Sequence, residues 1–205
     1  MKHYAGGKFN RHGQAAVLTN AELDRIARQL TKPAHRAFFA IARYTGERWG
    51  AICKLETEDC YQCISGLCEP RNVITFRART RKAAPTGARQ TRQVIAVTRL
   101  VESLGQFEPQ VGTPWLFPSP FYPEKPITFS AAYRWLERAV DRAGLKHRGV
   151  STHSLRRSFI TRLAEAGTSL HVLQEITGHK SVEALRRYIA VSPDAIATAM
   201  ANTFQ

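Results

Sequence analysis

The sequence has few acidic residues and no long apolar run, and each of these features excludes some classes of protein. Only 16 Asp and Glu stand against 30 Lys and Arg, a net charge of +14. No run of about 18 apolar residues, the length that a membrane helix needs, is present, and residues 1–17 lack the apolar middle of a signal peptide. We therefore expect a cytoplasmic protein with no membrane-spanning segment.

Cysteine is also scarce, with four residues in one short stretch at positions 53, 60, 63 and 68. Cys60 and Cys63 have the spacing of a zinc knuckle or a redox pair. A closed zinc site needs two such pairs, however, and Cys53 lies in a helical pattern where it suits the core. A zinc site, a disulfide and buried or incidental thiols all stay open; a reducing cytoplasm disfavours the disulfide. We expect thiols and no metal site.

The residues that are abundant indicate a folded protein with a polyanionic partner. Hydrophobic residues make up 43% of the chain, as is ordinary for a globular protein. The basic excess is spread along the chain, which favours nucleic acid first and an anionic membrane surface second. Residues 1–18 have no periodic pattern and are predicted to form a flexible basic arm, and residues 19–205 to form the folded part.

Periodicity predicts an α+β fold that is mostly helical and carries one small antiparallel sheet or hairpin. Thr19 and Glu22 match a capping box at the start of the first helix. The segments 72–80 and 90–98 are rich in β-branched residues and are separated by a proline-glycine turn, which predicts a hairpin. Further helices are expected over 34–45, from about 47, over 129–143, 152–166, 169–177 and 182–190, and from Pro193.

Arg156 raises a question within the predicted helix 152–166. Leu155, Phe159 and Leu163 recur every four residues and form an apolar stripe. At about 100° per residue, Arg156 falls at the edge of that stripe, with His153 on the same side. The side chain could cover the core and end in water, or it could be held half buried and directed at a ligand. This stretch alone leaves both interpretations open.

A wider set of residues decides between them. Arg48 stands in Thr-Gly-Glu-Arg, His153 and Arg156 in His-Ser-Leu-Arg-Arg, and His179 follows Gly178, with Tyr188 nine residues later. In order and spacing this set resembles the tyrosine recombinase (phage integrase) family. The resemblance covers about residues 19–205 and implies the fold of that family's catalytic domain. It also implies a site-specific DNA recombinase or integrase that needs no cofactor, metal or ATP.

The resemblance implies a role for each of these side chains. Arg48 and Arg156 would bind the non-bridging oxygens of the scissile phosphate, because guanidinium forks stay charged near neutral pH. His179 would donate a hydrogen bond to the same phosphate. His153 would orient this cluster and help to move the proton of the nucleophile. Tyr188 would be the nucleophile and would form a 3′-phosphotyrosine.

The remaining predicted site residues are three in the hairpin segment and one beside Arg156. The one lysine of the hairpin segment, Lys82, matches the family's lysine that protonates the leaving 5′ oxygen. Arg79 and Arg81, on the same segment, and Arg157, beside the second arginine, are the predicted DNA-binding residues. The expected partners are double-stranded DNA and further copies of the chain in a synaptic tetramer.

Two departures from the family pattern are visible. Where the family often has an acidic residue, three positions after the first arginine, this chain has Ala51. Either another carboxylate, Glu56 or Glu58, orients Arg48 instead, or Arg48 is held less firmly. We also expect the chain to lack the helical domain that usually precedes the catalytic domain. The chain thus resembles a member with the catalytic domain alone, or an excised fragment, of bacterial, phage or mobile-element origin.

Two alternative functions share these residues. A type IB topoisomerase uses the same chemistry on one strand without a partner site. A DNA-binding member that has lost turnover would keep the fold, and Ala51 is the only feature that points to it.

Overall fold

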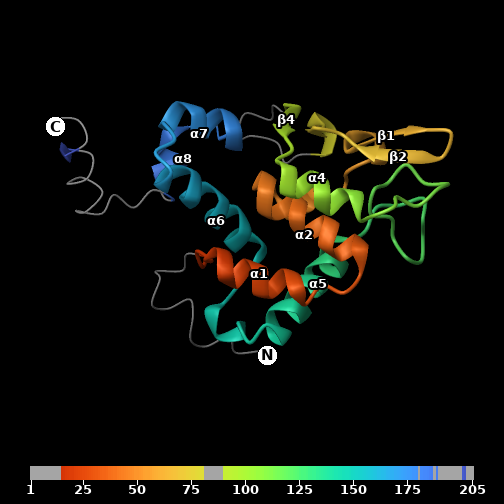
Figure 1. The fold of residues 1–205 in the computed structure, drawn as a ribbon, viewed down its shortest axis with the longest axis horizontal. Helices are drawn as coiled ribbons and strands as arrows, with labels where there is room; N and C mark the ends of the chain where they lie inside the picture. Colours follow the sequence, from red (N-terminus) through yellow and green to blue (C-terminus); the bar gives the residue numbers. More distant parts are fainter. Residues whose placement is uncertain (1–14, 81–89, 180, 187, 189–199, 202–205) are drawn as a thin grey trace. The chain divides into compact units, whose positions relative to one another are not determined.

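The computed structural model describes residues 15–80, 90–179, 181–186, 188 and 200–201. The chain divides into two compact units, Met1–Phe159 and Ile160–Gln205. Within the described residues there are eight α-helices and two small antiparallel sheets (Figure 1). The predicted α+β class, mostly helical with little sheet, is therefore confirmed.

The first unit contains two sheets, five whole helices and the start of a sixth. Its strands form two separate hairpins, β1 with β2 and β3 with β4. In chain order the elements are α1 (Asn20–Arg28), α2 (Pro33–Thr45), α3 (Trp49–Ile52), β1 (Tyr61–Ile64), β2 (Leu67–Pro70), β3 (Val73–Phe76), β4 (Arg92–Ile95), α4 (Thr98–Gly105), α5 (Phe129–Arg142) and the first half of α6 (Thr152–Glu165).

Local sequence signals explain the first helix and its start. The Thr19 side chain accepts a hydrogen bond from the Glu22 backbone, and the Glu22 carboxylate accepts one from the Thr19 backbone N–H at 2.9 Å. This is the predicted capping box, which satisfies two of the N–H groups that a helix start leaves without partners. Leu23 and Ile26 then turn inward and are buried.

The sheets differ from the prediction in two ways. The β3–β4 hairpin is present, with Phe76 opposite Arg92, but each strand is shorter than predicted. The segment from Thr98 is helix α4, because Leu100 and Leu104 have helical spacing and are fully buried; the predicted strand 90–98 thus ends early. Hairpin β1–β2 carries no strong alternation and was not predicted.

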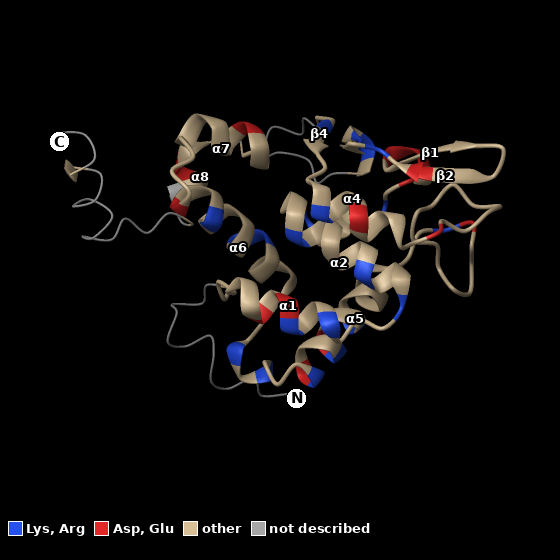
Figure 2. Ribbon diagram, viewed as in Figure 1, with Lys and Arg blue, Asp and Glu red and all other residues tan. Residues whose placement is uncertain are grey.

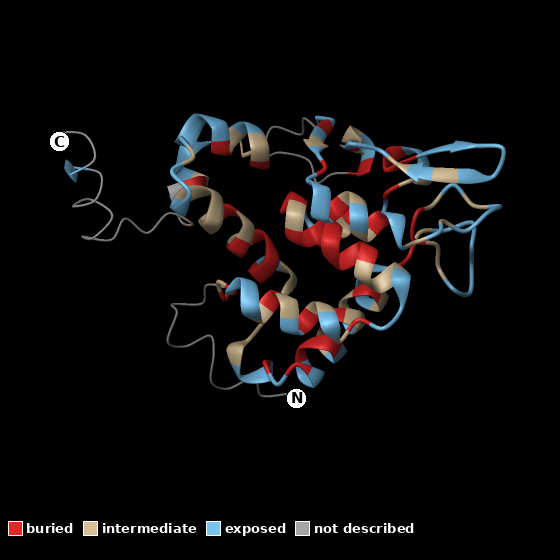
Figure 3. Cartoon of the chain, viewed as in Figure 1, coloured by how far each residue is buried: buried red, intermediate tan, exposed pale blue. Residues whose placement is uncertain are grey.

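The core of the first unit surrounds α2. This helix is buried along most of its length (Figure 3), and it packs against α4. Phe38 lies at its centre, with the rings of Trp49 and Phe117 within 4.6 Å and 4.9 Å of its own, centroid to centroid. A core of this kind fixes the position of the turn that follows α2.

Lys and Arg residues are distributed over many of the described elements (Figure 2), and some of them stabilise the fold. Arg25 on α1 donates to the carbonyl of Ala143 beyond the end of α5, at 2.5 Å. In return, Arg142 on α5 donates to the carbonyl of Gln29 beyond the end of α1, at 2.6 Å. Each helix end thereby gains a cation at its negative pole. These two arginines hold α1 and α5 together.

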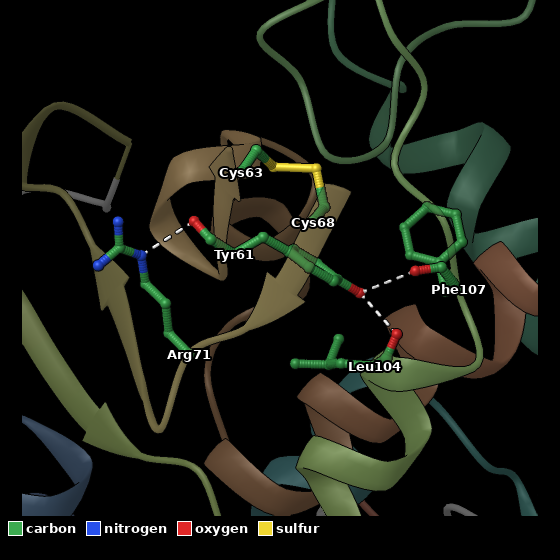
Figure 4. Close-up of a disulfide and its surroundings, with 6 residues drawn as sticks. All are labelled: Tyr61, Cys63, Cys68, Arg71, Leu104 and Phe107. Atoms are coloured by element: carbon green, nitrogen blue, oxygen red, sulfur yellow. Dashed lines mark hydrogen bonds between the residues drawn. A yellow bond between two sulfur atoms is a disulfide. The ribbon is translucent and has the colours of Figure 1, made fainter. Parts of the chain in front are cut away.

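The cysteines behave differently from one another. Cys63 and Cys68 face each other across the β1–β2 hairpin and form a disulfide (Figure 4). The expectation of incidental thiols is therefore wrong for Cys63 and Cys68. Their spacing in the sequence did not show that they face each other across a hairpin. The expectation is confirmed for Cys53 and Cys60, which are buried and free. Burial raises the pKa of the Cys53 thiol to about 12.

The hairpin that carries this disulfide is anchored at its base by Tyr61. The Tyr61 hydroxyl, which is buried, donates to the carbonyl of Leu104 at 2.8 Å and reaches that of Phe107 at 3.2 Å (Figure 4). Arg71 donates from Nε to the Tyr61 carbonyl at 2.9 Å. The disulfide therefore links the exposed strands, and Tyr61 links the hairpin to α4.

Residues 15–18 pack with the first unit instead of continuing the predicted arm. Ala16 and Leu18 are fully buried, and the Leu18 N–H donates to the hydroxyl of Ser158 on α6 at 2.7 Å. Residues 1–14, the rest of the predicted arm, lie outside the described residues.

The second unit contains the end of α6, then α7 (Leu170–Thr177) and α8 (Val182–Arg186). Its buried apolar side chains are Ile160, Leu173 and Leu185. Helix α8 ends before the predicted position 190, and the helix predicted from Pro193 falls almost wholly outside the described residues. No helix in the described part of the chain is both long and apolar enough to span a membrane.

Candidate active site

The first site arginine follows a turn that requires glycine. Helix α2 ends at Gly46, which has a left-handed φ of 59°. A Cβ at this position would lie 2.3 Å from the Phe159 ring. Both the backbone conformation and the space therefore exclude other residues. After this tight turn, Arg48 caps α3 and its side chain is exposed.

The second site arginine, Arg156, holds that turn. It lies on α6, is 5% exposed, and donates from Nη1 to the Gly46 carbonyl at 2.6 Å. The interpretation of Arg156 as a side chain that ends in water is therefore wrong. Arg156 also lines a pocket, so the residue that ties the Arg48 turn to α6 borders a cavity.

This pocket has a volume of about 850 Å³ and is lined by several positively charged side chains. His153, one turn before Arg156, lines it together with Arg48 and the N-terminal end of α5 at Thr128. None of the described lining residues is acidic. Its basic lining residues are Arg48, Lys54, Arg79, Lys125 and Arg156. The arrangement suits an anion, because several positively charged residues line one space, although one of them, Arg79, pairs with the carboxylate of Glu56.

Glu47, which the sequence analysis passed over, fixes the backbone next to Arg48. Its carboxylate is buried, accepts from the Arg48 backbone N–H at 2.8 Å, and pairs with Arg92 Nη1 at 2.8 Å. Arg92 Nη2 in turn donates to the Thr45 carbonyl at 3.0 Å. Such additional hydrogen bonds offset part of the free-energy cost of removing a buried ion pair from water. The pair thus attaches the Arg48 turn to strand β4.

The carboxylates expected to orient Arg48 have other partners. Glu56 pairs with Arg79, and Glu58 pairs with Arg77. Among the described residues no carboxylate pairs with the guanidinium of Arg48. The expectation that Glu56 or Glu58 orients Arg48 is therefore wrong, and Glu47 contacts the backbone of Arg48 instead of its side chain. The other expectation, that the Arg48 side chain is held less firmly, stays a prediction. Its place directly before Arg48 was the available signal, but Arg92, 45 residues away, could not be assigned to it.

Arg79 reaches the pocket from a short 3₁₀ turn, Ala78–Thr80, that directly follows strand β3. An ion pair between Arg77 Nε and Asp59 Oδ1, at 2.6 Å, anchors the start of this turn. Asp59 is 2% exposed; burial raises its pKa, and the bond to Arg77 opposes that shift. The predicted DNA-binding residue Arg79 thus lies at the pocket, with Glu56 beside it.

Of three other predicted residues, the structure describes only Arg157. Lys82 and Arg81 belong to the segment 81–89, which lies outside the described residues. Arg157 donates from Nη1 to the carbonyl of Ala15 at 2.9 Å, within the first unit. This contact gives Arg157 a structural role, and its contact with a flanking phosphate stays a prediction.

His179 and Tyr188 lie together in the second unit. Helix α7 ends at Gly178, with φ of 66°, and the chain turns directly into His179. Tyr188 follows α8, and its backbone carbonyl accepts from the Thr161 hydroxyl at 3.2 Å. The two ring centroids are 5.7 Å apart. The predicted nucleophile and one predicted phosphate ligand are therefore neighbours, although nine positions separate them.

Within the described residues no group of three or more His, Cys, Asp or Glu side chains is placed to hold a metal ion. Cys60 is buried and free, whereas Cys63 is in the disulfide. These two cysteines therefore do not face a common ligand.

Comparison with known proteins connects this geometry to a family. Tyrosine recombinase XerD of Corynebacterium glutamicum is 38% identical over 71 residues, which are 35% of this chain and 23% of that protein. XerD of Mycobacterium tuberculosis is 41% identical over 70 residues, or 34% of this chain and 22% of that protein. The matched segments thus span about a quarter of these relatives.

Solved structures share the fold over nearly the whole chain. The crystal structure of XerA recombinase aligns with a TM-score of 0.71 at 21% identity, covering 94% of this chain and 66% of that one. The catalytic domain of bacteriophage HP1 integrase aligns with a TM-score of 0.58 at 22% identity, covering 91% of this chain and 94% of that domain. The phage integrase family matches residues 16–194. The chain belongs to the phage integrase family, whose members include the tyrosine recombinases.

Proposed function

We propose that the chain cuts and rejoins DNA at specific sites through a covalent 3′-phosphotyrosine. The observation that carries the proposal is the pocket of the first unit, where five Lys and Arg side chains and His153 meet without an acidic lining residue among those described. DNA supplies the matching anion, a phosphodiester. The net charge of +14 favours the same partner.

The residues would divide the reaction as follows. Tyr188 forms a bond to phosphorus while the bond from phosphorus to the 5′ oxygen breaks, which gives a 3′-phosphotyrosine and a 5′-hydroxyl. His153 takes part in removing the phenol proton, and Lys82 gives a proton to the 5′ oxygen. Arg48, Arg156 and His179 stabilise the charge on the two non-bridging oxygens; Arg48 and Arg156 do so as forks. The reverse sequence rejoins the strand and needs no external energy.

We propose that residues 19–205 act as the catalytic domain and residues 1–18 as a basic arm, of which residues 15–18 pack on that domain. Arg79, Arg81 and Arg157 would bind phosphates beside the cleaved one. A cytoplasmic location follows from a DNA substrate in a bacterium, the source of the XerD relatives.

The proposed recombinase function can be tested with a pool of DNA duplexes whose central sequence is randomised. The protein is incubated with the pool, the reaction is stopped with detergent, and the DNA that stays attached to protein is sequenced. We expect covalent adducts on one sequence motif made of two inverted half-sites, and exchange between two DNA molecules that carry it. Relaxation of a plasmid without paired sites, at the same rate, would favour the topoisomerase alternative. Binding without any adduct would favour a DNA-binding member.

We also propose that copies of the chain assemble on paired sites as a tetramer. The structure of XerH recombinase contains a palindromic DNA substrate, and the apolar positions 196, 200 and 204 recur every four residues near the end of this chain. Met200, the described one of the three, is exposed. An apolar stripe of this kind is suited to packing on a neighbouring copy. The two-site substrate above also tests this proposal, because exchange requires both sites in one assembly.

The role of Lys82 can be separated from that of the arginines. A 5′ bridging sulfur leaves as a thiolate without a proton, so it does not need an acid. We expect Lys82→Ala to cleave normal DNA about a hundredfold more slowly or worse, as for loss of a general acid, and to recover on the sulfur substrate. The measurement is the single-turnover rate of adduct formation on both substrates. Equal recovery of Arg48→Ala would contradict this assignment.

A further inference from the structure

Two consecutive hydrogen bonds connect helix α7 to the His179 ring through the Thr177 hydroxyl. The Thr177 hydroxyl lies 2.6 Å from the Leu173 carbonyl and 2.6 Å from His179 Nδ1. Thr177 is 1% exposed, so its hydroxyl is shielded from water, whereas His179 is half-buried. The three residues, Leu173, Thr177 and His179, all belong to the second unit and lie close together in the sequence.

The number of protons fixes the direction of each bond. A carbonyl oxygen can only accept, so the Thr177 hydroxyl donates its one proton to Leu173. The contact between Thr177 and His179 therefore needs a proton on Nδ1, which donates to the hydroxyl oxygen. In the neutral ring the other nitrogen, Nε2, then carries a lone pair and accepts.

The backbone reinforces this orientation of the ring. The N–H of Gly178 donates to the Gln174 carbonyl at 2.7 Å, which closes α7 immediately before His179. The Gln174 side chain donates to the His179 carbonyl at 3.3 Å. The residue is thus held on both its side-chain and its main-chain atoms, with Tyr188 as its ring neighbour.

We propose that Thr177 is a positioning residue that sets the tautomer of His179 and so selects Nε2 as the nitrogen that acts. The reaction role of this nitrogen rests on the proposed function. Because the Nδ1 proton is used by Thr177, Nε2 donates to a phosphate oxygen only when the ring holds both protons. The contact with the scissile phosphate is then a charge-assisted hydrogen bond, stronger than one from a neutral imidazole.

The tautomer is tested in the free protein, without DNA. Ring nitrogen and carbon shifts are recorded by NMR at a pH at which imidazole is neutral, and the His179 signal is assigned from its loss in His179→Gln. We expect the wild type to carry the proton on Nδ1. In Thr177→Val, which keeps the shape and removes the hydroxyl, we expect a larger share of the ring protonated on Nε2. A wild-type ring protonated on Nε2 would overturn the proposal.

The positioning role is tested by the rate of adduct formation. We expect Thr177→Val to slow it by about tenfold to a hundredfold, the loss that follows removal of the group that orients a metal-bound histidine. Thr177→Ser keeps the hydroxyl and should recover most of the rate and the Nδ1 tautomer. Val172→Ala, at an exposed position of the same helix, controls for general effects on α7.

The outcomes separate the two proposals. If Thr177→Val forms the adduct at the wild-type rate, Thr177 has no positioning role, whatever the tautomer. If the wild type forms no adduct on any DNA, the proposed function fails, while the NMR result still decides the tautomer.

Discussion

Replacing Tyr188 by phenylalanine is expected to abolish the covalent protein–DNA adduct while leaving DNA affinity nearly unchanged. The substitution removes one oxygen, which is the proposed nucleophile, and keeps the ring beside His179. The Tyr188 backbone contacts to Leu185 and Thr161 do not involve that oxygen and are retained. Adduct yield on a nicked duplex, measured after denaturation, checks the chemistry, and a binding titration checks affinity.

A matched variant makes this result specific. Tyr122 is 60% exposed, in the proline-rich loop before α5, and Tyr122→Phe removes the same oxygen from another part of the chain. We expect its adduct yield to equal that of the wild type. An undiminished adduct from Tyr188→Phe would mean that another residue is the nucleophile.

Replacing Arg156 by alanine is expected to lower the rate of adduct formation by about a hundredfold to a thousandfold, as for the loss of one charge-stabilising donor. The same change removes the hydrogen bond to the Gly46 carbonyl. Leaving that buried carbonyl without its donor costs about 1–3 kcal/mol of unfolding free energy. Single-turnover cleavage and denaturant unfolding measure the two losses separately.

Two further variants distinguish these contributions. Arg156→Lys keeps the positive charge but has no fork to serve both the phosphate and the carbonyl, so we expect a partial loss of rate. Arg28→Ala removes one exposed positive charge from α1 and controls for the general effect of charge on DNA affinity. If Arg28→Ala and Arg156→Ala slow cleavage equally at saturating DNA, Arg156 has no particular role at the phosphate.

Capping and periodicity patterns predicted the elements that depend only on a few neighbouring residues. The capping box at Thr19 and the end of the predicted helix 34–45 are of this kind, since each depends on backbone groups within one helical turn. The position of Arg156 at the edge of the apolar stripe also followed from helical periodicity. Helix α4 packs against α2, and strand β2 contacts α4. The β1–β2 hairpin and α4 were missed because these contacts join segments that are far apart in the sequence.

The sequence by itself determined the family, through the order and spacing of Arg48, His153, Arg156, His179 and Tyr188, and it determined the mostly helical character through periodicity. Only the tertiary structure decided which groups hold these side chains. Glu47 and Arg92 are 45 residues apart and pair because a buried charge must find a partner. Arg156 reaches Gly46 across 110 positions. Such pairings depend on which surfaces the core brings together, and no local pattern contains that information.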